Sequence, residues 1–234
     1  VIAICNVGEG TKANDSSKIG KFGIGFKSVY RYTDAPEIHS DTEHFKINNY
    51  VFPEKLNSKL SDKTYPTIFV LKFSGDETEC LEKKESLIHF FENFSARDIL
   101  FLNNIKSITV ETELTDTILI KKAILDTKND NNIRQSNISL TYSRGQKCIS
   151  EDHYILFTLE DRDQSATRVS IAYLIDDSGS PIAVRQSPFY AYFPTSIESD
   201  LSFLVNAPFE TTPARDNLKT CSENDFLFDD IATL

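Results

Sequence analysis

Hydrophobic and polar residues follow two different patterns along this chain. Up to about residue 103, apolar residues recur at three- and four-residue spacing or in short continuous runs. Beyond that point, short strand-like segments alternate with turn residues. The first pattern is typical of helices combined with a few buried strands, and the second is typical of antiparallel sheet. We therefore expect an α+β chain whose two parts meet between residues 103 and 127, and we place the boundary at 115/116.

The first part carries three predicted elements of some length. Residues 26–32 fit a short helix that ends before Pro36, and residues 68–73 form an apolar run that predicts a strand inside a sheet. Residues 76–94 carry an apolar and aromatic stripe at helical spacing, which we expect to lie in the core. Ser95 can cap a second short helix directly after it. Shorter strands are predicted at residues 37–40 and 45–47, and a polar loop at 57–66.

From residue 105 onward the chain contains seven strand-like segments, which predict a mainly antiparallel β region. We assign residues 116–234 of this region to the β domain. The segments are residues 105–111, 117–125, 137–142, 154–159, 168–175, 189–193 and 201–206. Turn residues separate them, notably at 129–132, 144–145 and 176–179.

Two glycine-rich stretches near the start carry the candidate chemistry. Gly20, Gly23 and Gly25 stand at G-x-x-G-x-G spacing directly before the expected helix. Glycine lets the backbone approach a ligand closely, and the start of a helix suits an anion such as phosphate. Upstream, Gly8 and Gly10 form a second stretch. On spacing alone, the three later glycines fit a plain turn as well as a ligand site.

These two stretches are followed by Thr67, which opens a β-rich run. The order of these motifs along the chain and their residues resemble those of the GHKL ATPases. The wording IGKFGIGFKSVY is closest to the heat-shock-chaperone-like and sacsin-like branch. The resemblance is strong over residues 1–75 and weaker to about residue 220. It implies part of a Bergerat-type α/β sandwich over residues 1–115, followed by a β-rich, transducer-like domain. It also implies ATP as the ligand and magnesium as its cofactor.

The resemblance assigns roles to individual residues. The hinge of a mobile lid matches Gly8, Gly10, Thr11 and Lys12. The phosphate loop matches Gly20, Lys21, Phe22, Gly23, Ile24, Gly25 and Phe26. Thr67 matches a threonine that contacts the adenine end, and Lys27 adds positive charge near the phosphates. A surface loop, a solvated lysine cluster and an ordinary β-branched strand residue are the plain alternatives for these sites.

A later segment, residues 206–217, supplies the candidate catalytic residue, Arg215. By analogy with the family, a cation from the second domain reaches the γ-phosphate when the lid closes and stabilises charge on the transferred phosphoryl group. The alternative is an ion pair of Arg215 with Asp216 or Glu210 inside a turn.

Two earlier motifs of the family are not found in this sequence. One is a helix that carries the acidic general base and a magnesium-binding Asn, and the other is an Asp-x-Gly turn. The chain also contains no Met. We therefore expect it to be an incomplete piece of its parent protein, inactive as an ATPase by itself, whereas the parent binds and hydrolyses ATP.

Composition restricts the partners. The net charge is −10 and the basic residues are scattered, which does not favour direct nucleic-acid binding. No apolar run reaches the length of a membrane span. Four widely spaced cysteines and four histidines show neither disulfide nor metal spacing, which fits a cytoplasmic location.

The leading hypothesis is an ATP-driven conformational switch in a sacsin-like or chaperone-like protein that acts on a client or partner protein, with a homodimer as a further expectation. The alternative is a nucleotide-free scaffold or interaction module that keeps the fold without ATPase activity. A histidine kinase is disfavoured because no helix with a phospho-acceptor His is visible.

Overall fold

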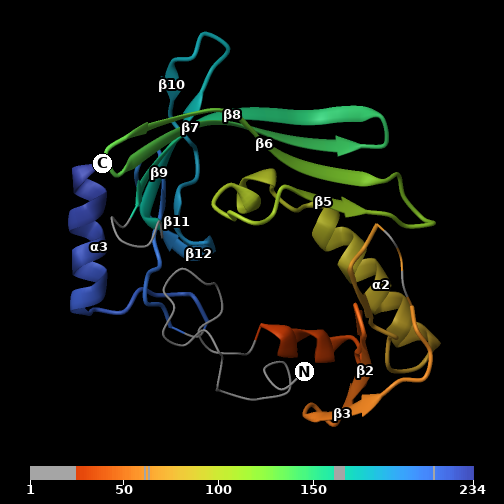
Figure 1. Ribbon diagram of the computed structural model, residues 1–234. Coiled ribbons are helices and arrows are strands. Elements are labelled where there is room, and N and C mark those ends of the chain that lie inside the picture. Colours follow the sequence, from red (N-terminus) through yellow and green to blue (C-terminus); the bar gives the residue numbers. More distant parts are fainter. Residues whose placement is uncertain (1–24, 61, 63, 161–166, 213) are drawn as a thin grey trace. The chain divides into compact units, whose positions relative to one another are not determined.

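The computed structural model describes residues 25–60, 62, 64–160, 167–212 and 214–234 (Figure 1). The chain forms two compact units, Val1–Phe90 and Phe91–Leu234, which we describe separately. Their division lies N-terminal to the domain boundary expected at 115/116. The described residues confirm an α+β chain made mostly of β structure. Whether the first unit is part of a Bergerat-type sandwich remains a prediction.

The first unit contains a four-stranded antiparallel sheet with the order β3-β2-β1-β4. Its strands are β1 (Glu37–Ser40), β2 (Glu43–Asn48), β3 (Phe52–Lys55) and β4 (Thr67–Val70). The predicted strands at 37–40 and 45–47 are confirmed, and the one predicted at 68–73 is present but ends at Val70. Strand β3 was not predicted, because all four of its residues are exposed and give no alternating pattern. Within the described residues β4 lies at one end of the sheet, where an interior position was expected.

A short 3₁₀-helix, η1 (Phe26–Arg31), packs on this sheet and confirms the helix expected at 26–32. Phe26 and Tyr30 of η1 lie against a small core formed by Ile38, Phe45 and Ile47. The alternation of these three residues along β1 and β2 places them on one face of the sheet. The helix is therefore held by aromatic packing.

Helix α2 (Glu77–Glu92) begins at a reciprocal cap. The Glu79 N–H donates to Asp76 Oδ1 at 2.9 Å, and the Asp76 N–H donates to Glu79 Oε2 at 3.2 Å. The predicted helix is confirmed, but the expected burial of its stripe is wrong for Leu81 and Phe90, which are 51% and 56% exposed. Helical spacing predicts which side chains share a face, but it does not identify what covers them.

The second unit contains a nine-stranded sheet with the order β12-β11-β13-β9-β8-β7-β6-β5, and β10 pairs with β9. Its strands are β5 (Ser107–Val110), β6 (Ile118–Asp130), β7 (Ile133–Arg144), β8 (Lys147–Glu160), β9 (Thr167–Ile175), β10 (Pro181–Ile182), β11 (Pro188–Ala191), β12 (Phe193–Glu198) and β13 (Leu204–Asn206). All seven predicted strands are present, and only β10 and β12 were missed. Neighbouring strands are antiparallel except β11 and β13, which are parallel.

Two helical elements complete the second unit. The 3₁₀-helix η2 (Ala96–Ile99) begins at Ser95, whose side chain accepts the Arg97 N–H, as the sequence predicted. Helix α3 (Ser222–Thr233) was not predicted, and it contacts strand β9 (Figure 1). Leu227 and Ile231 of α3 pack against the core cluster that includes Val169 and Ile171.

One charged side chain lies inside this unit. Lys122 is only 8% exposed, and its Nζ donates to the carbonyl oxygens of Ile99 at 3.1 Å, Leu100 at 3.3 Å and Leu102. These carbonyls lie at the end of η2 and in the turn that follows it, and the Ile99 oxygen also accepts the Leu102 N–H at 3.2 Å. Burial lowers the pKa of Lys122 to about 8. Lys122 thus acts as a buried cap for η2.

Candidate functional site

Two residues of the predicted phosphate loop, Gly25 and Phe26, belong to the described part of the chain. Gly25 stands immediately before η1 with helical dihedral angles, φ −55° and ψ −47°. Its carbonyl oxygen accepts the Ser28 N–H at 3.3 Å and the Ser28 hydroxyl at 2.8 Å. No described atom lies within 4 Å of the position that a Cβ would occupy. The carbonyl side of Gly25 is thus held by η1, and its Cα side meets no described residue other than its chain neighbours.

Phe26 and Lys27 are both held by contacts inside the first unit. The Phe26 ring lies 6.0 Å from the Phe69 ring and 6.5 Å from the Tyr30 ring, measured between centroids. Lys27 Nζ donates to the Tyr50 carbonyl oxygen and lies 5.7 Å from the centre of the Tyr30 ring. Phe26 therefore anchors η1 to strand β4, and the Lys27 ammonium is drawn toward the Tyr50 main chain.

Thr67 is the first residue of β4, and it is exposed. It pairs with Ser40 of β1, and the two hydroxyl oxygens are 2.8 Å apart. The contact between Phe26 and Phe69 connects η1 to the strand that begins at Thr67. This contact places Gly25, which precedes Phe26, and Thr67, which begins the strand of Phe69, on two elements that pack against each other.

The remaining predicted ligand-binding residues lie outside the described residues. They are Gly8, Gly10, Thr11, Lys12, Gly20, Lys21, Phe22, Gly23 and Ile24. Their roles as lid hinge and phosphate loop stay predictions.

Arg215 lies in a closed loop of the second unit, residues 210–219, which we call the Arg215 loop. A β-bridge between Thr211 and Leu218 closes its base, and the Thr212 N–H donates to the Asn217 carbonyl oxygen at 3.0 Å. Arg215 has a φ of +57°, in the left-handed region that side chains disfavour. The Arg215 N–H donates to the Thr212 carbonyl oxygen at 2.9 Å, which holds this turn.

The Arg215 side chain is bound to main-chain carbonyl groups. Its Nη2 donates to the oxygens of Ala191 and Phe193, both at 2.9 Å, at the turn between β11 and β12. Its Nε is buried and has no hydrogen bond within the described part of the chain. Burial lowers the pKa of the guanidinium.

The structure does not contain the alternative arrangement, an ion pair of Arg215 with Asp216 or Glu210. Asp216 accepts the Thr212 hydroxyl at 2.5 Å, and Glu210 pairs with Lys219 at 3.5 Å. Arg215 makes no ion pair with another described residue. Its predicted action on a phosphate is not tested by these contacts.

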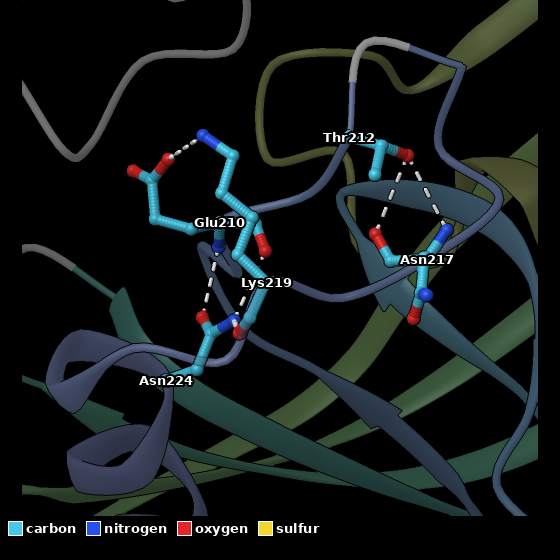
Figure 2. Close-up of polar contacts among 5 residues, drawn as sticks. All are labelled: Glu210, Thr212, Asn217, Lys219 and Asn224. Carbon is cyan, nitrogen blue, oxygen red and sulfur yellow. Dashed lines mark hydrogen bonds and ion pairs between the residues drawn. The ribbon is translucent and has the colours of Figure 1, made fainter.

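A buried asparagine of α3 fixes the base of the Arg215 loop (Figure 2). Asn224, which is 2% exposed, donates from Nδ2 to the carbonyl oxygens of Glu210 at 3.0 Å and Lys219 at 2.7 Å. Its Oδ1 accepts the Glu210 N–H at 2.9 Å. All of these hydrogen bonds join the Asn224 amide to main-chain groups of the loop. Sequence analysis missed Asn224, because no local pattern connects it with residues 210–219.

Two histidines that show no metal spacing in the sequence lie side by side. His39 and His44 are opposite each other in β1 and β2, and their Nδ1 atoms are 3.2 Å apart. His39 Nε2 is 3.8 Å from Glu37 Oε2, and the Leu60 N–H donates to His39 Nδ1 at 3.4 Å. Among the described residues no group of three His, Cys, Asp or Glu could hold a metal ion.

No helix in the described part of the chain is long and apolar enough to cross a membrane.

Comparisons with known proteins agree with the sacsin-like side of the resemblance. The profile of the Sacsin domain family matches residues 1–64, which include both glycine-rich stretches and η1. The protein NO VEIN of Arabidopsis thaliana is 28% identical over 243 aligned residues, which cover 92% of this chain. The chain spans 8% of the length of that relative. No solved structure matches the chain.

Proposed function

We propose that this chain supplies the phosphate-binding side of an ATP site in a sacsin-like protein, where ATP binding and hydrolysis drive a conformational switch. The first unit would belong to a Bergerat-type ATP-binding domain, and the second unit would transmit its change. The client or partner protein that responds to the switch is left open.

The observation that carries this proposal is the position of Gly25. Its helical dihedral angles are open to any L-residue, so the backbone does not require glycine there. Packing does not require it either, since no described atom lies within 4 Å of a Cβ at this position. A cap preference at the start of η1 is one reason for glycine. The other is close approach of a ligand, which also explains Gly20 and Gly23 upstream.

The family match supports the same reading of this segment. Residues 1–64 match the Sacsin domain profile, and this range contains η1 together with the residues predicted to form the lid hinge and the phosphate loop. The likeness to NO VEIN runs through both units. We infer that the β-rich unit accompanies the glycine-rich segment as part of one functional module.

In this proposal Arg215 is the cation that contacts the γ-phosphate. Its guanidinium would exchange the carbonyl oxygens of Ala191 and Phe193 for phosphate oxygens. Phosphate oxygens carry negative charge and can accept two parallel N–H bonds from one guanidinium, so they would compete with the neutral carbonyl oxygens for this donor. The described residues offer no cluster of metal ligands, so no step is assigned to magnesium here.

Calorimetry with ATP and ADP in the presence of magnesium tests the proposal. It is performed on the 234-residue chain and on a polypeptide extended upstream of Val1. Gly25→Ala is the informative variant, because a methyl group at this position meets no described atom. We expect binding in the extended form and at least about tenfold weaker binding in Gly25→Ala, with unchanged thermal stability.

Gly179→Ala, in a turn of the second unit, serves as the control, and its φ of +80° means that this variant should lose about 1 kcal/mol of stability. It should leave the affinity for ATP unchanged. Absence of nucleotide binding in both lengths of the protein would contradict the proposal and favour the nucleotide-free scaffold. Full affinity in Gly25→Ala would show that this glycine does not approach a phosphate.

A further inference from the structure

A pocket of about 220 Å³ lies in the second unit between η2 and strands β11 and β12. Arg97 and Asp98 of η2 form one wall, and Tyr190 of β11 and Glu198 of β12 form the other. Its volume is below that of a typical drug-binding pocket, about 300 Å³ or more, and suits one group the size of a side chain. No role was assigned to this pocket above, and all four residues belong to one unit.

The cationic wall of the pocket is occupied by internal hydrogen bonds. Arg97 Nε donates to the Tyr154 hydroxyl at 3.2 Å, and Arg97 Nη1 donates to the Gln186 carbonyl oxygen at 3.0 Å. Tyr154 is fully buried, so this contact fixes the guanidinium against the core. Arg97 therefore shapes the wall, and its donors are directed largely into the protein.

Two acceptors of the pocket, by contrast, accept no hydrogen bond from a described residue. Within the described residues the carboxylate of Asp98 and the hydroxyl of Tyr190 make no hydrogen bond, although both groups line the pocket. Tyr190 is 1% exposed, so the protein surrounds its side chain on every side except the pocket. Burial raises the pKa of Asp98, and the neighbouring charge of Arg97 offsets only part of this effect.

Glu198 adds a second negative charge at the exposed rim. One of its oxygens, Oε2, accepts the Ser187 N–H at 2.9 Å, which holds the carboxylate in place. With Arg97, Asp98 and Glu198 all ionised, the pocket carries one net negative charge. The free acceptors of the pocket require a hydrogen-bond donor, and its negative charge attracts a cation. A cationic group with N–H donors meets both requirements.

We propose that this pocket binds an organic cation, an ammonium or guanidinium group carried by a small amine or by a Lys or Arg side chain. The N–H groups of the ligand donate to the Asp98 carboxylate and to the Tyr190 hydroxyl oxygen, and Glu198 attracts the cation at the rim. An anion does not fit, since it would face two carboxylates. This inference is independent of nucleotide binding.

The test is a titration of the ¹⁵N-labelled full chain, followed by NMR chemical shifts. The probes are n-butylguanidinium and n-butylammonium chloride, with sodium butyrate as the anionic control and sodium chloride at matched ionic strength. We expect saturable shifts at the amides of Arg97, Asp98 and Ser196 with the cations only. The peptides acetyl-Gly-Lys-Gly-amide and acetyl-Gly-Arg-Gly-amide form a second arm, and tighter binding of a peptide than of the free amine identifies a protein side chain as the ligand.

Variants locate the cation. Asp98→Asn keeps the shape of the side chain and should weaken binding about tenfold, whereas Tyr190→Phe should weaken it a few-fold. Asp177→Asn, at an exposed turn, is the matched control and should change nothing. If Asp98→Asn lowers the thermal midpoint strongly, Glu198→Gln replaces it as the charge-removing variant. Absence of saturable shifts up to tens of millimolar, preferential binding of butyrate, or full affinity in both charge-removing variants would overturn the proposal.

Discussion

Asn224 and Glu210 exchange two hydrogen bonds, one in each direction, through the Asn224 amide and the Glu210 main chain at 2.9 and 3.0 Å. This is the pattern that two residues of an antiparallel sheet form with each other, with a side chain in place of one strand. It allows helix α3 to hold the base of the loop next to the bond from the Lys219 N–H to the Glu210 carbonyl oxygen, at 2.9 Å.

Asn224→Asp should therefore destabilise the second unit. Aspartate has the same shape, but it replaces the donor that binds the Glu210 and Lys219 carbonyl oxygens by a further acceptor. We expect a loss of about 3 kcal/mol in the free energy of unfolding, because a negative charge at this buried position would face both carbonyl oxygens, although the Glu210 oxygen keeps the Lys219 N–H at 2.9 Å. Urea denaturation monitored by circular dichroism at pH 7 measures it. Asp225→Asn, one position further on and exposed, should change stability by less than about 0.5 kcal/mol; an equal loss in both variants would contradict the role of the amide.

Lys122 should make stability depend on pH. Its pKa is lowered from 10.5 to about 8 in the folded state, so above about pH 8 the unfolded chain binds a proton that the folded chain does not. Stability contributed by this group therefore rises with pH, by at most about 1.4 kcal/mol per pH unit, between these two values. Burial raises the pKa of Tyr190 and Tyr154, whose ionisation in the unfolded chain opposes the rise above about pH 10.

The measurement is the free energy of unfolding in urea between pH 7.5 and about pH 9.5. Lys122→Met removes the titrating group, and the slope of the wild type minus that of the variant should be positive. Equal slopes in the two proteins would show that Lys122 remains protonated in the fold, held by its three carbonyl partners.

Arg215→Ala should cost about 1 to 2 kcal/mol of stability even without nucleotide, because the Ala191 and Phe193 carbonyl oxygens lose their donor. Arg215→Gly loses the same contacts but relieves the backbone at φ +57°, by about 1 kcal/mol. We expect the glycine variant to be the more stable of the two by thermal denaturation. Arg185→Ala, at an exposed position, is the control. If alanine and glycine at 215 are equally stable, the left-handed turn is not retained in the variants.

Gly145 should be far less tolerant of alanine than Gly25. Gly145 has a φ of +57° in the turn between β7 and β8, and its N–H donates to the Thr117 carbonyl oxygen at 2.8 Å. Gly145→Ala should cost about 1 kcal/mol, since a Cβ is strained there whatever the space around it. Gly25→Ala should be neutral to slightly stabilising. Thermal denaturation of both variants checks the pair, and a larger loss at Gly25 would reverse the structural assignment.

Local chemistry explains which parts of this fold could be predicted. Ser95 identified η2 because a cap and its N–H partner are neighbours in the sequence. The burial of Lys122 was also open to prediction, since Ile118 and Ile120 precede it on the same face of β6. A lysine that continues the every-second-residue alternation of apolar side chains along a strand is the pattern that predicts a buried lysine.

The remainder depends on contacts that no local pattern contains. Asn224 meets Glu210 across 14 residues, and Arg215 meets Ala191 across 24. The pocket combines Asp98 with Tyr190, which only the packing of η2 on the sheet brings together. The resemblance of residues 206–217 to the family identified Arg215 as a candidate, but the partners of its side chain followed from the fold alone.

The place of β13 in the sheet has a consequence for synthesis on the ribosome. Strands β5 to β9 pair in the order in which they are made, so this part of the sheet can grow as the chain emerges. β13 is inserted between β9 and β11, and its residues Leu204 and Asn206 pair with Ala172 and Ser170. Strand β10 pairs only with Leu174 and Ile175 on that edge of β9. Until Asn206 has left the exit tunnel, the stretch from Ser170 to Ala172 therefore has no permanent partner there, and the nascent chain presents a partly open strand to its surroundings. Translation speed across residues 176–206 therefore sets how long the half-made protein is vulnerable to aggregation.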